Sequence, residues 1–151
     1  MTFTVDEVSE ELEVLPPVQT RDEAIAAIRE TCAKYEFVRC AALFGSFSRN
    51  GQTDKSDVDV LAKLAPGVRF ADFCDLGYEL VQVLGRNVDL VSSMYGASRT
   101  FFESVVRDGI IVYGDVEGAN VKVVTNDDFV AHSVKFMEEY DDAFRALANI
   151  D

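Results

Sequence analysis

The sequence of 151 residues contains one histidine and three cysteines. Reactive sites that are built from several histidines or from paired cysteines are therefore not expected. Catalytic triads and histidine-ligated metal sites both depend on histidine, and His132 stands alone in a late helical pattern. The cysteines, Cys32, Cys40 and Cys74, are odd in number, and no two have the paired spacing of zinc or redox sites. We therefore expect three reduced cysteines that behave as small apolar side chains.

Long apolar runs are also missing, although hydrophobic residues make up 48% of the sequence. No stretch approaches the roughly 18 residues that a membrane span needs. The opening residues, MTFTVDEVSEELEV, are acidic and lack the basic start and apolar centre of a secretory signal. The sequence therefore predicts a cytoplasmic protein with no membrane segment, and its length suits one domain with one core.

Basic residues are scarce, since 14 lysines and arginines stand against 27 aspartates and glutamates, a net charge of −13. The acidity lies at the ends: residues 1–20 carry five acids and no base, and residues 115–151 carry nine acids and three bases. Such a chain lacks the positive surface that binds nucleic-acid backbones. We expect no direct nucleic-acid binding, and a basic protein or a cationic small molecule as partner. Acidic ends that only keep the chain soluble are an equal alternative.

The order of the predicted elements is typical of an α/β domain. Thr20 and Glu23 form a capping-box pattern, which predicts that a helix begins there. This helix has one buried face because apolar residues recur at helical spacing, at Ile25, Ile28, Cys32 and Tyr35. Apolar runs and periodicity then predict strands at 38–44, 57–64 and 87–93, helices at 70–84 and 99–109, and a strand or extended edge at 110–114.

Two flanking segments differ from this pattern. Residues 1–19 form an acidic lead-in that we expect to be loose, and residues 20–114 hold the α/β domain. In the extension 115–151, Asn126 can cap a long amphipathic helix over roughly residues 127–149. The apolar side of this helix must be buried, either against the core of the same chain or against a second subunit, as in a homodimer, or a partner protein.

Two aspartates, Asp57 and Asp59, stand one residue apart at the start of a predicted strand. Residues i and i+2 of a strand point to the same face about 6.6 Å apart, so both carboxylates would face one spot. A divalent cation relieves the repulsion between two such charges, and magnesium accepts one or two carboxylates while leaving room for phosphate oxygens. Just upstream, Gly45-Ser46 follows an apolar strand and can form a turn whose backbone N–H groups bind a phosphate.

Other motifs for phosphate binding or nucleophilic catalysis are absent. A Walker A loop needs four residues between its glycines and then a lysine. Here Gly45 and Gly51 enclose five residues, and Gln52 follows. The sequence contains neither the Gly-x-Ser-x-Gly of hydrolases nor the Gly-x-Gly-x-x-Gly of dinucleotide-binding domains. The turn and the aspartate pair are therefore the candidate site.

Taken together, the turn and the aspartates resemble a family signature. Phe44-Gly45-Ser46, ten intervening residues and Asp57-Val58-Asp59-Val60 are similar to the motif of the polymerase-beta-type nucleotidyltransferase superfamily, and above all to its minimal nucleotidyltransferases. In that family a later strand supplies a third carboxylate, and the segment NVDLV places Asp89 at the matching point. The resemblance covers roughly residues 24–113.

One departure from the family pattern lies in the turn itself. The family often has glycine directly after the arginine, whereas here Asn50 separates Arg49 from Gly51. Asparagine adopts the left-handed backbone conformation nearly as readily as glycine in turns. We therefore expect the turn to keep its shape.

The resemblance implies a fold, an activity and roles for individual residues. The fold would be a nucleotidyltransferase-type short mixed sheet with helices mainly on one face, and the activity would be magnesium-dependent transfer of AMP from ATP to a hydroxyl. Asp57 and Asp59 would hold the magnesium ion, and Asp89 would bind a second metal ion and help to deprotonate the hydroxyl. The nucleotide would be bound by Gly45, Ser46, Arg49 and Ser56.

The resemblance leaves three alternatives for the acceptor and the mode of action. Minimal nucleotidyltransferases commonly act as antitoxins that adenylylate a tyrosine of a HEPN-type ribonuclease toxin, which implies a protein partner. An aminoglycoside-type enzyme would instead modify a cationic small molecule, but such enzymes carry a larger helical domain than residues 115–151 offer. An antitoxin that acts by binding alone is the third alternative, and the three aspartates argue against it.

Removal of residues 127–151 tests the role of the expected terminal helix. If its apolar side docks on a partner or a second subunit, the truncated protein should lose complex formation or dimerisation more than it loses ATP binding. Size-exclusion chromatography and an ATP titration measure the two effects. Unfolding of the truncated protein would instead assign the helix to the core.

Overall fold

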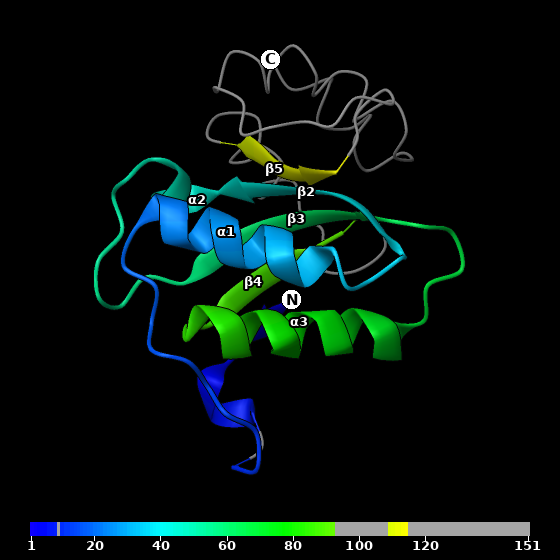
Figure 1. The fold of residues 1–151 in the computed structure, drawn as a ribbon, viewed down its shortest axis with the longest axis horizontal. Helices are drawn as coiled ribbons and strands as arrows, with labels where there is room; N and C mark the ends of the chain where they lie inside the picture. The colour runs from blue at the N-terminus through cyan, green and yellow to red at the C-terminus, as the bar shows by residue number, and fades with distance from the viewer. Residues whose placement is uncertain (9, 93–108, 115–151) are drawn as a thin grey trace.

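The computed structural model describes residues 1–8, 10–92 and 109–114. Its strands are β1 (Thr2–Phe3), β2 (Val38–Phe44), β3 (Val58–Leu64), β4 (Val88–Val91) and β5 (Ile110–Gly114). Within the described residues they form one sheet in the order β1-β4-β3-β2-β5 (Figure 1). β3 and β4 are parallel, and the other neighbouring pairs are antiparallel. The expected short mixed sheet is therefore confirmed.

Four helical segments accompany the sheet in the described part of the chain: η1 (Val5–Glu7), α1 (Arg21–Cys32), α2 (Gly45–Ser48) and α3 (Phe70–Leu84). The two longer helices, α1 and α3, pack against each other and cover one face of the sheet (Figure 1). The strands direct alternate residues to these helices, so that Val58, Val60 and Leu90 share one core with Ile28 and Leu76. This arrangement confirms the expected α/β fold with helices mainly on one face.

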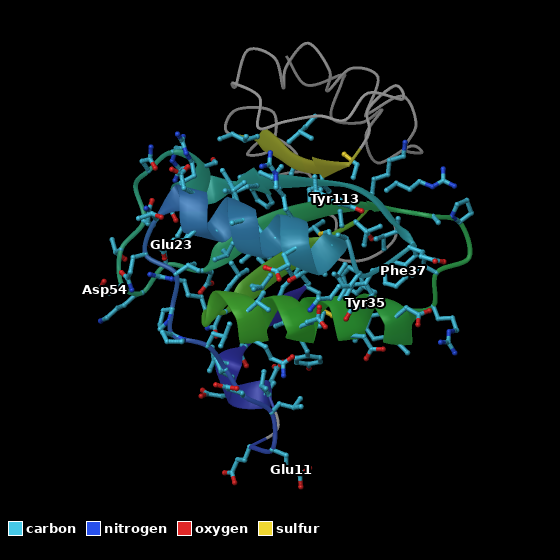
Figure 2. The ribbon with its side chains drawn as sticks, viewed as in Figure 1. Glu11, Glu23, Tyr35, Phe37, Asp54 and Tyr113 are labelled. Carbon is cyan, nitrogen blue, oxygen red and sulfur yellow. The ribbon has the colours of Figure 1, made fainter. Side chains whose placement is uncertain are left out.

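Helix α1 begins where the sequence predicts it. The Thr20 hydroxyl accepts a hydrogen bond from the Glu23 N–H at 3.1 Å, which is the N-cap interaction. The Glu23 carboxylate accepts from the Gln19 N–H at 3.0 Å, one residue before the position that a capping box assigns to it. After the helix, Tyr35 and Phe37 pack with ring centroids 5.3 Å apart and lead the chain into β2 (Figure 2).

Two parts of the N-terminal segment, residues 1–8 and 15–18, are docked on the domain, so the expectation of a loose lead-in is wrong for them. In the β1–β4 ladder Phe3 lies opposite Val88. The Phe3 side chain is 2% exposed and packs edge-to-face against Phe73 and Tyr78 at centroid distances of 5.8 and 4.9 Å. A Cβ on Gly77 would lie 2.5 Å from the Phe3 ring, so the absence of a side chain there lets the ring into the core.

The segment continues across the end of α3. The N–H of Leu15 donates to the carbonyl of Gln82, and the N–H of Val18 donates to the carbonyl of Leu84, both at 2.9 Å. Gly85 ends the helix in the left-handed conformation with a φ of 65°. A Cβ on Gly85 would lie 2.3 Å from the Leu15 carbonyl oxygen, so glycine is required for this close approach.

The expected strands at 57–64 and 87–93 are present as β3 and β4, with shorter bounds. β2 and α3 have the predicted bounds, and 110–114 is a strand, as one of the two expected alternatives proposed. No disulfide joins the three cysteines, as expected, and burial raises the pKa of the Cys32 thiol to about 12. Within the described ranges, no helix is both long enough and apolar enough to cross a membrane. The expected helices at 99–109 and 127–149 lie outside the described residues, apart from residue 109.

Replacement of Phe3 by alanine measures how firmly β1 is docked. The change removes a buried aromatic ring, so the free energy of unfolding should fall by about 3–5 kcal/mol in urea denaturation. The matched control is Leu12→Ala in the same segment, because Leu12 is 52% exposed and a surface change should stay within about 0.5 kcal/mol. Equal effects of the two variants would show that the segment is not part of the core.

Candidate active site

The site begins where β2 ends. Gly45 follows the strand with a φ of 72°, a conformation that side chains with a Cβ rarely adopt. A Cβ on Gly45 would lie 2.1 Å from the Asp59 Oδ2 atom, far inside van der Waals contact. Phe44 and Asp59 are opposite each other in the antiparallel β2–β3 ladder, which fixes this approach. The glycine is therefore required both by the backbone conformation and by the carboxylate that lies against it.

Three carboxylates lie at this end of the sheet. Asp59 and Asp89 are direct partners in the parallel β3–β4 ladder, and neighbouring strands are about 4.8 Å apart. Asp57 lies one residue before β3 and is exposed, and its charge acts on Asp59. The alternate residues Val58 and Val60 belong to the core beneath α1 and α3. The aspartates of the two strands therefore face away from these helices, at the point where β2 ends and β3 and β4 begin.

The crowding of negative charge changes how easily these carboxyls ionise. Burial, followed by the charges of Asp89 and Asp57, raises the pKa of Asp59 from 3.8 to about 7, and the nearby Arg49 guanidinium partly opposes the shift. The pKa of Asp57 is also raised, first by burial and then by Asp89. Both shifts have the causes expected when like charges share a partly buried site.

The arrangement is suited to a hard divalent cation that also binds phosphate. Among residues 1–8, 10–92 and 109–114, no group of three or more His, Cys, Asp or Glu side chains is placed to hold a metal ion, so Asp57, Asp59 and Asp89 do not form such a group. Magnesium does not require one, because it is typically held by one or two carboxylates together with phosphate oxygens and waters. Asp57 and Asp59 supply two such ligands, and a bound cation would favour the ionised form that their crowding now opposes. The residues present therefore fit magnesium.

Asp89 also contacts the N-terminal amine of the chain. The Met1 amine donates to Asp89 Oδ1 at 3.4 Å and to the Leu90 carbonyl at 3.0 Å. Both partners of the ion pair are substantially exposed, at 41% and 36%, so it adds little stability. The sequence gives no sign of this contact, because it depends on the pairing of β1 with β4.

The turn after Gly45 is closed by backbone and hydroxyl hydrogen bonds. The Ser48 hydroxyl donates to the Gly45 carbonyl at 2.9 Å, and the Gly51 N–H donates to the Ser46 carbonyl at 2.8 Å. Asn50 has a φ of 57° and is the one non-glycine residue with a left-handed backbone in the described part of the chain. The expectation that asparagine maintains this turn is thereby confirmed.

The loop from α2 to β3 leads directly to the aspartates. The Ser56 hydroxyl accepts a hydrogen bond from the Thr53 N–H at 2.8 Å, which closes a second turn just before Asp57. Its oxygen therefore has a partner within the loop, and nucleotide contact by Ser56 stays a prediction. Asp54 lies in the same loop and is exposed (Figure 2).

One residue beside the site was not indicated by the sequence. Arg86 is 5% exposed and follows the end of α3. Its guanidinium donates to the backbone carbonyls of Val18, Thr53 and Ser56. An isolated arginine after a glycine has no periodicity or motif, so only the folded arrangement reveals its contacts.

The geometry and the sequence identify the family. The model of the family described as "Polymerase beta, Nucleotidyltransferase" matches residues 26–117, which is more than half of the chain. The match includes the turn at Gly45 and all three aspartates. The chain therefore belongs to the polymerase beta nucleotidyltransferase family.

Two proteins of Methanocaldococcus jannaschii are similar to part of the chain. The "Putative protein adenylyltransferase MJ0435" is 42% identical over 55 residues, covering 36% of this chain and 59% of the relative. Its counterpart MJ0128 is 43% identical over 58 residues, covering 38% of this chain and 58% of the relative. The chain thus spans less than two thirds of the length of either relative.

A solved structure has the same fold. It is described as a toxin-antitoxin with AMP-PNP and aligns with a TM-score of 0.52, covering 87% of this chain and 97% of its own. The sequence identity is 21%, so the likeness shows a shared fold and no more.

The raised pKa of Asp59 predicts a pH dependence of stability. Since folding raises the pKa from 3.8 to about 7, the folded state holds the proton more tightly than the unfolded chain. The stabilisation is fully present below pH 3.8 and is lost as the pH rises through about 7. The free energy of unfolding, measured in urea without divalent cations, should therefore fall more steeply over this range in the wild type than in Asp59→Asn.

Asp54→Asn is the matched control, because it removes an exposed aspartate of the same region and should keep the wild-type slope. If Asp59→Asn and Asp54→Asn have the same slope, the proton is not held by Asp59.

Proposed function

We propose that the protein is a magnesium-dependent nucleotidyltransferase that moves AMP from ATP to a hydroxyl. The observation that carries the proposal is the position of the Asp59 carboxylate, which lies against Gly45 and opposite Asp89. The closeness of Asp59 to Gly45 supports a site that binds both a metal ion and phosphate. Family membership of residues 26–117 supports the same reaction class.

In this proposal each residue acts on a different part of ATP or of the acceptor. Gly45 and Ser46 would present backbone N–H groups to the terminal phosphates, with Arg49 and Ser56 as further nucleotide contacts. Asp57 and Asp59 would hold magnesium, which supplies positive charge to the phosphate oxygens when it is bound. Asp89 would ligate a second metal ion and take up the proton of the attacking hydroxyl.

The reaction exchanges one oxygen on the α-phosphorus of ATP for another. The acceptor oxygen forms a bond to the α-phosphorus of ATP while the bond from that phosphorus to the bridging oxygen of the β-phosphate breaks. Pyrophosphate leaves, and the proton of the acceptor passes to Asp89 and then to solvent. The chain would accelerate this step mainly by holding the reacting groups in line.

We propose a tyrosine of a HEPN-type toxin as the acceptor, so that the protein acts as an antitoxin. Two relatives are named as protein adenylyltransferases, and the shared fold occurs in a toxin–antitoxin structure. The net charge of −13 suits a partner with a basic surface. In this scheme residues 20–114 form the catalytic unit, and the extension 115–151 contributes to partner binding or to a homodimer.

Incubation with ATP, magnesium and a HEPN-type toxin, followed by mass spectrometry of the toxin, tests the proposal. The toxin should gain the mass of one or more adenylates, and chelation of magnesium should prevent the gain. Asp57→Asn should lower the transfer rate at least about 100-fold, because a ligand of the phosphate-bound ion is lost. Its stability without magnesium should equal or slightly exceed that of the wild type, since one of the crowded charges is removed.

Asp54→Asn is again the matched control and should transfer AMP at the wild-type rate, because Asp54 is exposed in the loop (Figure 2). Tight binding of the toxin without any mass change would support the antitoxin that acts by binding alone. A mass gain on an aminoglycoside but not on the toxin would support the small-molecule enzyme.

A further inference from the structure

Arg86 occupies an unusual position for a charged residue. It lies between the glycine that ends α3 and the start of β4, three residues before Asp89. Its side chain is buried, with 5% of its surface exposed. Burial of a guanidinium is unfavourable unless its N–H groups find acceptors, so the identity of those acceptors indicates what the residue does.

The acceptors come from two segments that are distant in sequence. The Nε atom donates to the Val18 carbonyl at 2.7 Å. The Nη1 atom donates to the Thr53 carbonyl at 2.8 Å and to the Ser56 carbonyl at 3.0 Å. The guanidinium carbon also lies 4.9 Å from the centre of the Phe47 ring, as in a cation–π contact.

Two of these contacts adjoin the candidate site. The Ser56 carbonyl belongs to the peptide bond that leads into Asp57, so its direction constrains the backbone of that aspartate. Phe47 follows Ser46 in the phosphate turn. The guanidinium therefore connects the turn that would bind phosphate with the strand end that would bind metal, and it does so from the connection that leads to Asp89.

The loop between these parts has internal hydrogen bonds as well. The Thr53 carbonyl accepts from the Ser56 N–H at 3.1 Å, in addition to the bond from Arg86. The Thr53 N–H donates to the Ser56 hydroxyl. These bonds shape the turn, but they lie within it and do not attach it to the rest of the domain, whereas the bonds from Arg86 do.

We propose that Arg86 is a positioning residue of the nucleotidyltransferase site, which sets the placement of Asp57 relative to the turn at Gly45 through the 53–56 loop. The inference rests on the proposed function, because that function makes the site a nucleotidyltransferase site. The role of the arginine within it is argued from the contacts described above. The planar fork of arginine donates in two directions at once, toward Val18 and toward the loop. Lysine has a single flexible ammonium and reproduces this only in part.

The test compares full-length Arg86→Met and Arg86→Lys with the control Arg29→Met. Arg29 also donates from its side chain to a backbone carbonyl, that of Val112 in β5, and lies on α1. Each variant is assayed for AMP transfer at saturating ATP and toxin over a range of magnesium concentrations, below its melting temperature. Hydrogen exchange of the Thr53 and Ser56 amides is measured on the same samples.

In Arg86→Met the two loop amides should exchange at least about tenfold faster than in the wild type. The kcat should fall about 10- to 100-fold, because misplacement of reacting groups by about an ångström has such effects. The magnesium concentration for half-maximal rate should rise, since one ligand is held less firmly. Arg86→Lys should recover part of each loss. Arg29→Met should lower the stability of the protein, but the exchange of the loop amides and the magnesium dependence should stay unchanged.

Unchanged exchange of Thr53 and Ser56 in Arg86→Met would overturn the inference, whatever the activity. Faster exchange with wild-type kcat and magnesium dependence would also overturn it, because the arginine would then be structural only. Absence of AMP transfer in the wild type and in every variant would overturn the proposed function instead, and the exchange data would still decide whether Arg86 fixes the loop.

Discussion

The parallel register of β3 against β4 is the constraint on which the rest of the site depends. It pairs Asp59 with Asp89, and the antiparallel register of β2 brings Gly45 to the same point. A shift of β3 or β4 by one residue would turn an aspartate toward the core and a valine or leucine toward the site. Chemistry and packing therefore specify the same register, since the side chains between the aspartates form part of the core beneath α1 and α3.

The carboxylates of the site repel one another, so the rest of the fold must offset this repulsion. Raised pKa values at Asp57 and Asp59 show that the carboxylates are placed where ionisation is unfavourable. The opposite face compensates, because Val58, Val60 and Leu90 are fully buried there. Functional sites commonly concentrate such unfavourable interactions, and the surrounding fold must be stable enough to tolerate them.

Sequence reasoning predicted the parts that repeat or carry a motif. β2 was predicted with its observed bounds because it is a nearly continuous apolar run, and α3 because its apolar residues recur at helical spacing. The left-handed Asn50 followed from residue chemistry alone. β1 was missed because two residues cannot show an alternating pattern. The contacts of Arg86 were missed because they join residues that are 30 to 68 positions apart in the sequence. Local pattern defines elements, whereas contacts between distant segments become visible only after folding.

The position of Met1 has a practical consequence. Its backbone continues the β1–β4 ladder, since the Leu90 N–H donates to the Met1 carbonyl at 2.9 Å, and its amine points to Asp89. Any residues joined ahead of Met1, such as an affinity tag or a fused fluorescent protein, would leave the sheet beside the carboxylates. A fusion at this end would therefore turn the amine that contacts Asp89 into an uncharged amide.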